Sequence, residues 1–340
     1  IFMEYFIIES GKMWDETESI LRRKIAEGVT VKVMYDDIGN LTHMPRRFCK
    51  DLRKKGIDCL RFNPLRPIAS AVYNNRDHRK ITVIDGKTAF VGGVNFADCY
   101  INETHPLGHW KDCALMVRGA AVQTLTVMFL TAFDAQDATR LENYDEFVPE
   151  RYEYFDEEGI VQPFGDGPRP LYETHVAENV ILDMINGAKK YIYITTPYLI
   201  INNNLSSALC RAAISGVDVR IVTPRIPDKK IVFWITRRNY RKLLESGVKI
   251  YEYLPGFVHA KTYLSDDEVG MVGTINMDYR SLVHHYECGV WMYKTACLKD
   301  IRRDLESLFP ECEQMTPESA RLSVPKRVIS ALGSLFAPML

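Results

Sequence analysis

Apolar runs of strand length alternate with helical patterns along most of the chain, and the same succession occurs twice. Residues 1–8 and 193–200 are apolar runs, and each is followed by a helical pattern that ends at a glycine, Gly28 or Gly216. The β-branched runs that come next are 29–34 and 217–222. Strands that alternate with helices predict mainly parallel sheets covered by helices, one sheet in each half.

The repeat continues through residues 56–64 and 247–255, which both enter a strand through glycine and leave it through proline. We therefore predict an α/β fold with two pseudo-twofold-related halves, each containing a mostly parallel mixed sheet flanked by helices. The acidic and aromatic stretch 142–166 is expected to link them. The predicted units are a first half with its linker at 1–165, a second half at 166–315, and a C-terminal amphipathic tail at 316–340.

Composition is that of an ordinary globular protein, with 46% hydrophobic and 26% charged residues and a net charge of −1. Such a charge provides no long-range field for attracting a nucleic acid. The eight cysteines are scattered without the spacing of a metal knuckle or a disulfide framework, which predicts reduced thiols. No apolar run is long enough to span a bilayer. Because Ile1 starts a strand-like run directly, we expect that the natural N-terminus and any anchor it carried have been removed.

A duplicated motif carries the candidate chemistry. Its copies are His78, Lys80 and Asp85 in the first half and His259, Lys261 and Asp266 in the second. Side chains alternate between faces along a strand, so the histidine and lysine of each copy are predicted to share a face. Each aspartate stands where a tight turn is expected. The return strands end in candidate substrate-binding residues, which are Gly93 and Asn95 in one half and Thr274 and Asn276 in the other. A small residue admits a close approach, and an asparagine amide can donate to phosphate.

The two copies fit one reaction at phosphorus. Displacement of an alcohol from a phosphodiester needs a nucleophile on one side and an acid on the other, and histidine can serve in either role. Lysine and asparagine side chains would offset the charge on the non-bridging oxygens. On this reasoning the site requires neither a metal nor another cofactor.

The motif H-x-K-x4-D followed by G-G/T-x-N, present twice, resembles the duplicated motif of the phospholipase D superfamily. Similarity to bacterial cardiolipin synthases extends over nearly the whole chain and includes residues 33–39, 195–198 and 273–281. The resemblance implies the phospholipase D-like fold, with the active site between the halves. It also implies transfer of a phosphatidyl group from one phosphatidylglycerol to another through a phosphohistidine, giving cardiolipin and glycerol.

Roles for individual residues follow from the same resemblance. His78 is implied as the nucleophile and His259 as the acid and base. Asp112 and Glu287 are implied to hydrogen-bond the imidazole of the opposite motif. Whether Asp85 and Asp266 orient a histidine or hold the turn stays open. The implied partners are phosphatidylglycerol and a membrane surface, on the cytoplasmic side of the bacterial cytoplasmic membrane, with no nucleic acid.

Other functions are weighed against this one. A phospholipase D-type hydrolase would use water as the acceptor, and a nuclease of the same superfamily would need a basic stripe with stacking aromatics. A catalytically idle scaffold conflicts with two intact motifs.

Segments 36–48, 225–242 and 324–340 mix basic with apolar residues, as interfacial segments do. The alternative for 225–242 is an amphipathic helix that packs Ile231, Phe233 and Trp234 on the core. The alternative for 324–340 is packing on the body of the protein. His284 and His285 are interpreted as a strand-end pair, not as metal ligands. Residues 128–133 are predicted to lie in the core. The candidate pocket-lining residues are Tyr198, Tyr279 and Arg280.

Overall fold

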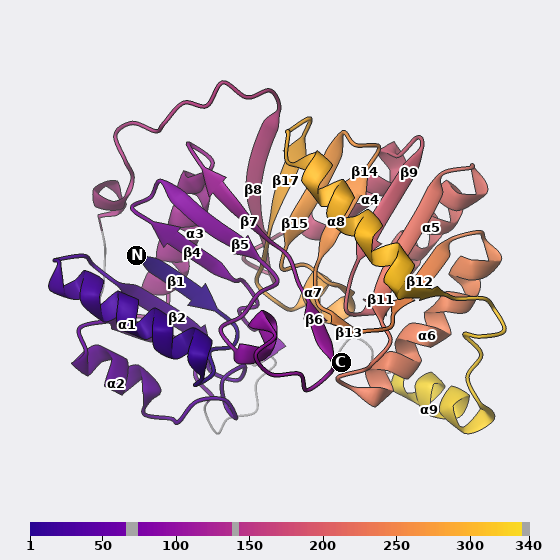
Figure 1. Ribbon diagram of the computed structural model, residues 1–340, viewed down its shortest axis with the longest axis horizontal. Coiled ribbons are helices and arrows are strands. Elements are labelled where there is room, and N and C mark those ends of the chain that lie inside the picture. The colour runs from indigo at the N-terminus through magenta and orange to yellow at the C-terminus, as the bar shows by residue number, and fades with distance from the viewer. Residues whose placement is uncertain (66–73, 138–142, 335–340) are drawn as a thin grey trace.

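The computed structural model describes residues 1–65, 74–137 and 143–334, and they form two sheets with helices packed on them (Figure 1). The first sheet has six strands in the order β3-β2-β1-β4-β5-β7. Its strands are β1 (Phe2–Tyr5), β2 (Lys32–Asp36), β3 (Asp58–Phe62), β4 (Ile81–Ile84), β5 (Thr88–Gly92) and β7 (Ala114–Arg118).

The second sheet has eight strands in the order β18-β12-β11-β9-β14-β15-β17-β8. Its strands are β8 (Ile160–Asp166), β9 (Tyr191–Thr195), β11 (Asp218–Pro224), β12 (Lys249–Tyr253), β14 (Thr262–Ser265), β15 (Val269–Gly273), β17 (Glu287–Tyr293) and β18 (Cys312–Gln314). Two small sheets complete the set, one from β10 (Leu199–Ile200) and β16 (Met277–Asp278), the other from β6 (His109–Lys111) and β13 (Gly256–Val258).

The two large sheets repeat one topology. Strands β3-β2-β1-β4-β5-β7 correspond in order to β12-β11-β9-β14-β15-β17, which is the duplication expected from the sequence. In each half the three strands before the motif are parallel, while the motif hairpin and the strand beside it are antiparallel. The α/β fold with mixed sheets is confirmed, but the sheets are less parallel than expected, because a hairpin necessarily adds antiparallel strands.

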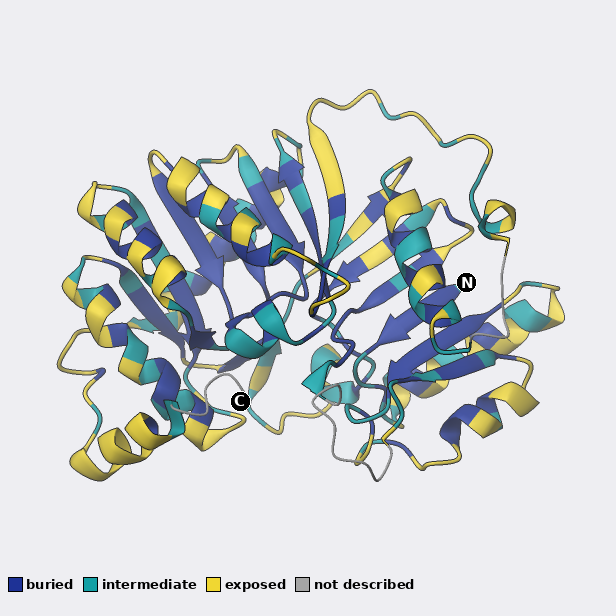
Figure 2. Cartoon of the chain, turned by 180° about the vertical axis from the view of Figure 1, so that it is seen from behind, coloured by how far each residue is buried: buried dark blue, intermediate teal, exposed yellow. Residues whose placement is uncertain are grey.

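Helices cover both faces of each sheet. The longer ones are α1 (Lys12–Ala26), α2 (Phe48–Lys54), α3 (Val122–Asp134), α4 (Val176–Gly187), α5 (Asn203–Ile214), α6 (Lys230–Glu245), α8 (Leu298–Leu308) and α9 (Val324–Ser334), with the short α7 (Tyr279–Val283) after the second motif. Helices α1 and α2 pack on one face of the first sheet, and α4, α5 and α6 pack on one face of the second. Figure 2 shows that the strands are largely buried while the outer faces of the helices are exposed.

One hydrophobic cluster spans both halves. It joins Phe2 of β1 and Phe129 of α3 to Leu264 of β14 and Leu305 of α8. Residues 128–133 belong to α3, where Phe129, Leu130 and Phe133 are fully buried, in agreement with the predicted core position. The halves therefore share a core, which fixes the position of one motif relative to the other.

Strand β8 crosses the expected boundary between the halves. Its residues Ile160–Asp166 pair along their whole length with β17, so the second sheet includes residues that precede the expected boundary at 165. Residue 142 of the predicted linker and residues 335–340 of the predicted tail lie outside the described residues.

Phe129→Ala is expected to lower the free energy of unfolding by about 3–5 kcal/mol, because the ring is fully buried and stacks on Phe2 with centroids 5.0 Å apart. Urea unfolding followed by circular dichroism measures the change. Ile214→Ala, at a helix residue that is 73% exposed, is the control and should change the value by less than about 0.5 kcal/mol. Equal losses in the two variants would contradict this account of the shared core.

Candidate active site

Each motif histidine is held by a backbone segment of the opposite half. The N–H of His78 donates to the carbonyl oxygen of Tyr286 at 2.9 Å, and the N–H of His259 donates to that of Lys111 at 2.7 Å. The residue after each of these carbonyls is an acid, Glu287 or Asp112. The same backbone contact thus places each acid beside the histidine of the other half.

The side chains complete this crossed arrangement. His78 Nδ1 lies 2.9 and 3.0 Å from the two carboxylate oxygens of Glu287, and His259 Nδ1 lies 2.7 Å from Oδ2 of Asp112. A carboxylate at Nδ1 favours the tautomer with its proton there, which leaves Nε2 as the free lone pair. Among the described residues, Nε2 of neither histidine has a hydrogen-bond partner. Both imidazoles are therefore set up to act through Nε2.

Burial keeps both imidazoles neutral at physiological pH. It lowers the pKa of His78 to about 3, against the opposing effect of Glu287. It lowers the pKa of His259 to about 4, and the charge of Lys261 acts in the same direction. Burial would raise the pKa values of Glu287 and Asp112, but the adjacent histidines bring both below their usual range. Two neutral imidazoles thus face two carboxylates.

The two motif lysines converge on the same site. Lys80 Nζ donates to the carbonyl oxygen of His78 at 2.5 Å, and Lys261 Nζ donates to that of His259. Burial lowers the pKa of Lys80 to about 8 and that of Lys261 to about 7, while Asp112 and Glu287 both act to raise them. The charge of Lys80 further lowers the pKa of Lys261. Because each lysine senses the acid of either half, the motifs form one site, and a phosphate anion there would stabilise both ammonium groups.

The two small residues before the asparagines serve the acids. A Cβ on Gly93 would come within 2.1 Å of Oδ1 of Asp112, so only glycine leaves room for that carboxylate. At the equivalent position, the hydroxyl of Thr274 donates to Glu287. Ser281 of α7 also donates to Glu287, at 2.5 Å. Gly93 and Thr274 thus position the orienting acids, and their contact with substrate stays a prediction.

The asparagines differ from one another. Asn95 uses Nδ2 to donate to the hydroxyl of Tyr100 at 2.7 Å and Oδ1 to accept from the N–H of Ile7 at 3.0 Å. Asn276 is buried, and its Oδ1 has no hydrogen-bond partner within the described residues. Asn276 is therefore the more available of the two for a ligand.

The motif aspartates lie at the hairpin turns and not beside the imidazoles. Asp85 and Asp266 adopt left-handed conformations with φ of 54° and 55°. The carboxylate of Asp266 accepts from the backbone N–H groups of Lys189, Lys190 and Tyr191 at 2.7, 2.9 and 2.9 Å, while Asp85 is exposed. Of the two roles that the sequence left open, these contacts support holding the turn: Asp266 ties its turn to the start of β9, and Asp85 occupies the matching turn.

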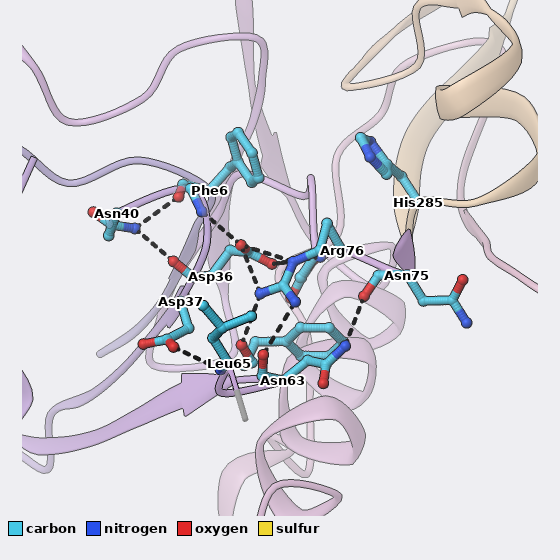
Figure 3. Close-up of polar contacts among 12 residues, drawn as sticks. Phe6, Asp36, Asp37, Asn40, Asn63, Leu65, Asn75, Arg76 and His285 are labelled. Carbon is cyan, nitrogen blue, oxygen red and sulfur yellow. Dashed lines mark hydrogen bonds and ion pairs between the residues drawn. The ribbon is translucent and has the colours of Figure 1, made fainter. Parts of the chain in front are cut away.

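A buried ion pair fixes the segment that enters the first motif (Figure 3). Arg76 donates from Nε and Nη2 to the carboxylate of Asp36, at 2.9 to 3.0 Å, and the backbone N–H of Asp77 donates to the same carboxylate at 3.0 Å. Asn40 holds the end of β1 by donating to the carbonyl oxygen of Phe6. The Phe6 ring in turn meets the His78 ring edge-on, with centroids 5.1 Å apart. This network sets the position of His78 from the side of β1 and β2.

Aromatic and histidine rings line the rest of the site, and the motif pattern gave no signal for most of them. Tyr100 and Trp110 lie against His259, and His285 lies against His78, each with centroids 5.5 Å from the motif ring. Of the three candidate lining residues, Tyr198 donates to Asp228, the Tyr279 ring lies 6.3 Å from His284, and the carbonyl of Arg280 accepts from the N–H of His285.

One set of potential metal ligands lies here. Ligand atoms of His78, His285 and Glu287 are within 4.8 Å of one another. Glu287 already accepts hydrogen bonds from His78, Thr274 and Ser281, so its oxygens are occupied within the protein. The group fits a hydrogen-bond network better than a metal site.

The family model and the sequence relatives that match this chain point to the same family. Residues 181–309 match the family model described as cardiolipin synthase, PLD-like domain. A cardiolipin synthase of a Geobacillus species is 37% identical over 345 residues, covering 100% of this chain and 67% of that protein. The chain belongs to the cardiolipin synthase family. That of Halalkalibacterium halodurans is 36% identical, with coverage of 100% and 67%. The membership confirms the predicted resemblance and supports the expected enzyme class, a phosphatidyltransferase.

Two further relatives agree. An uncharacterized protein of Streptococcus mutans is 46% identical over 344 residues, covering 100% of this chain and 73% of that protein. The crystal structure of a phosphatidylserine synthase from Haemophilus influenzae superposes with a TM-score of 0.73 at 15% identity, covering 99% of this chain and 87% of that one. The second likeness confirms the predicted fold.

Glu287→Gln is expected to lower turnover at least about 100-fold, because an amide cannot hold His78 in the required tautomer. Asp266→Asn is the matched control, since it keeps the turn geometry and lies away from the imidazoles. It should lower the melting temperature while leaving kcat within about threefold. Steady-state kinetics and thermal unfolding of both variants measure this, and a loss of kcat in Asp266→Asn as large as that in Glu287→Gln would contradict the assignment.

Stability should rise with pH between about pH 4 and 6.5. The folded-state pKa values of His78 and His259, about 3 and 4, lie below the unfolded value of 6.5, so the unfolded chain binds more protons in this window. The stability they contribute is present above pH 6.5 and is lost on acidification. Replacing both histidines with glutamine should reduce the fall between pH 7 and pH 5 by about 1–2 kcal/mol for each histidine. Urea unfolding at the two pH values tests this, and an unchanged pH dependence in the double variant would contradict it.

Proposed function

We propose that the protein transfers the phosphatidyl group of one phosphatidylglycerol to the glycerol hydroxyl of a second, forming cardiolipin and releasing glycerol. The observation that carries the proposal is the crossed pair of imidazoles, each held at Nδ1 by a carboxylate of the opposite half and each free at Nε2. The family membership supports the choice of substrate.

In the first half-reaction, Nε2 of His78 attacks phosphorus and forms a P–N bond. The bond from phosphorus to the glycerol oxygen breaks, and His259, protonated at Nε2, gives its proton to that oxygen. The phosphorylated imidazole retains its proton at Nδ1, and Glu287 stabilises its positive charge at 2.9 Å. Because glycerol leaves neutral, the mechanism releases no unstable alkoxide.

In the second half-reaction, the glycerol hydroxyl of another phosphatidylglycerol gives its proton to His259 and attacks phosphorus. The P–N bond breaks, and His78 returns to its neutral form. Asp112 at 2.7 Å stabilises His259 whenever it carries the proton. Both histidines finish in their starting states, so the cycle is balanced without another reactant.

The buried lysines would compensate the negative charge of the phosphodiester. In the free protein they repel each other, and burial destabilises their charged forms. A bound anion between them relieves both effects. Substrate binding would therefore favour protonated lysines and a protonated His259, which is the state the first step requires.

We also propose that the protein works at the cytoplasmic surface of the bacterial cytoplasmic membrane. Val324, Val328 and Leu332 of α9 are 70, 54 and 59% exposed and recur every four residues, so they share one helix face. Lys326 and Arg327 are also exposed on this helix. An exposed apolar stripe with adjacent cations suits the interface of an anionic bilayer.

Helix α6 lies beside α9 (Figure 1). It packs Val232, Ile235 and Tyr240 on the core, whereas Ile231 is 48% exposed, so the helix is rotated relative to the expected packing of Ile231. Within the described part of the chain, no helix has the length and apolar character required to cross a membrane.

Purified protein incubated with vesicles that contain labelled phosphatidylglycerol is expected to form cardiolipin and glycerol. His78→Ala and His259→Ala should each lower the rate by at least about 1000-fold, because the first removes the nucleophile and the second removes the acid and base. Thin-layer chromatography with mass spectrometry identifies the products. His109→Ala, an exposed histidine, is the control and should retain wild-type turnover.

Three outcomes contradict the proposal. Phosphatidic acid as the sole product indicates a hydrolase. Cleavage of single-stranded DNA without a lipid product indicates a nuclease. Cardiolipin formation by either alanine variant at the wild-type rate excludes the two-histidine mechanism.

A further inference from the structure

The two half-sites contain a second matched pair of rings besides the motif histidines. Trp110 lies against His259 and His285 lies against His78, and both pairs of ring centroids are 5.5 Å apart. Each ring stands two residues before the acid of its half, Trp110 before Asp112 and His285 before Glu287. The pseudo-twofold relation of the halves therefore places the two rings at equivalent positions.

Contacts with the motif histidines place both rings. Trp110 lies in β6 with its ring against His259, and His285 lies in the bend after α7 with its ring against His78 and its Nδ1 3.8 Å from Glu287. Figure 3 shows the side chains of His285 and Phe6, whose ring centroids lie 6.4 Å apart. Both rings accordingly lie beside the reaction site.

Both rings carry a buried nitrogen that has no hydrogen-bond partner among residues 1–65, 74–137 and 143–334. These are Nε1 of Trp110 and Nε2 of His285, and the His285 side chain is only 10% exposed. A buried polar group left unpaired costs about 1–3 kcal/mol. The indole nitrogen can only donate, and an imidazole nitrogen can donate when it carries a proton. Two buried ring nitrogens at the same site, with no partner in the described part of the chain, indicate a ligand that supplies hydrogen-bond acceptors.

We propose that Nε1–H of Trp110 and Nε2–H of His285 donate to the non-bridging oxygens of the phosphodiester, one from each half-site. The inference rests on the proposed function, since it takes phosphorus to lie between His78 and His259. The two donors then flank the phosphoryl group from opposite halves, beside the ammonium groups of Lys80 and Lys261. They are substrate-binding residues and take no part in proton transfer.

The two positions differ in their surroundings. Trp110 packs against Tyr100 and Phe257, with centroids 4.7 and 4.9 Å away, and contributes a neutral donor. His285 has Nδ1 at 3.8 Å from Glu287, so it stands beside the acid that holds His78.

Binding of inorganic phosphate to the whole protein, measured by isothermal titration calorimetry, tests the inference separately from catalysis. Trp110→Phe and His285→Phe keep a ring but remove the N–H, and each is expected to weaken phosphate affinity about 10-fold. His285→Gln restores a donor and should recover most of the affinity. His109→Phe is the matched control, because His109 precedes Trp110 in the sequence, is exposed, and is hydrogen-bonded to Tyr253. The phosphate affinity of this variant should equal that of the wild type. Melting temperatures identify variants that lose their fold. If His285→Phe does not fold, the phosphate affinity of His285→Gln is compared with that of the wild type instead.

Unchanged phosphate affinity in both phenylalanine variants would overturn the inference, and so would a wild-type protein that binds no phosphate. A protein that binds phosphate, loses about 10-fold in the two variants and yet forms no cardiolipin would support these donors while contradicting the proposed function. The two claims can therefore fail independently.

Discussion

A hydrogen bond from the imidazole of one half to the carboxylate of the other underlies the whole site. His78 with Glu287 and His259 with Asp112 are both crossed pairs, so neither half contains a complete catalytic unit. The backbone bonds from His78 to Tyr286 and from His259 to Lys111 fix the same register. A rotation of one half relative to the other would separate both imidazoles from their acids at once. The hydrophobic cluster shared by the two sheets prevents such a rotation.

The site concentrates buried charge, and nearly all of it has a partner. Arg79, between His78 and Lys80 in the motif, is 4% exposed and pairs with Asp77 at 2.9 Å and with Glu4 of β1 at 2.7 Å. The second half has Ala260 in the same place. Removing one partner of such a buried pair leaves an uncompensated charge, which costs about 3–5 kcal/mol. The two motif lysines are the exception. Both depend on the same two carboxylates, Asp112 and Glu287, and a bound phosphate would neutralise the remaining positive charge.

Much of this could be predicted from the sequence, because duplication is visible in spacing. The matching succession of strands and helices predicted that the two halves repeat one α/β fold, and equal spacing placed His78, Lys80, His259 and Lys261 at equivalent positions. Spacing alone says nothing about what a side chain touches. Asp266 bonds three backbone N–H groups at the start of β9. The hydroxyl of Thr274 donates to Glu287.

The rings of Trp110 and His285, and strand β8 at the edge of the second sheet, likewise could not be placed from the sequence. Residue 110 is a tryptophan and residue 285 is a histidine, so sequence comparison does not match them. Their equivalence appears only when the two sheets are aligned by their topology. The pairing of β8 with β17 joins residues that are far apart in sequence, and no local pattern encodes it. In each case long-range contacts decide the role, and a local pattern does not record them.

The central claim is that one imidazole bonds to phosphorus while the other serves as acid and base. Mass spectrometry of protein quenched in acid-free denaturant after mixing with phosphatidylglycerol, followed by proteolysis, tests this most directly. The account predicts a phosphatidyl adduct on His78, present in wild type and in a His259→Asn variant given a substrate with a good leaving group. An adduct on a residue outside the two motifs, or turnover with no adduct on either histidine, would contradict it.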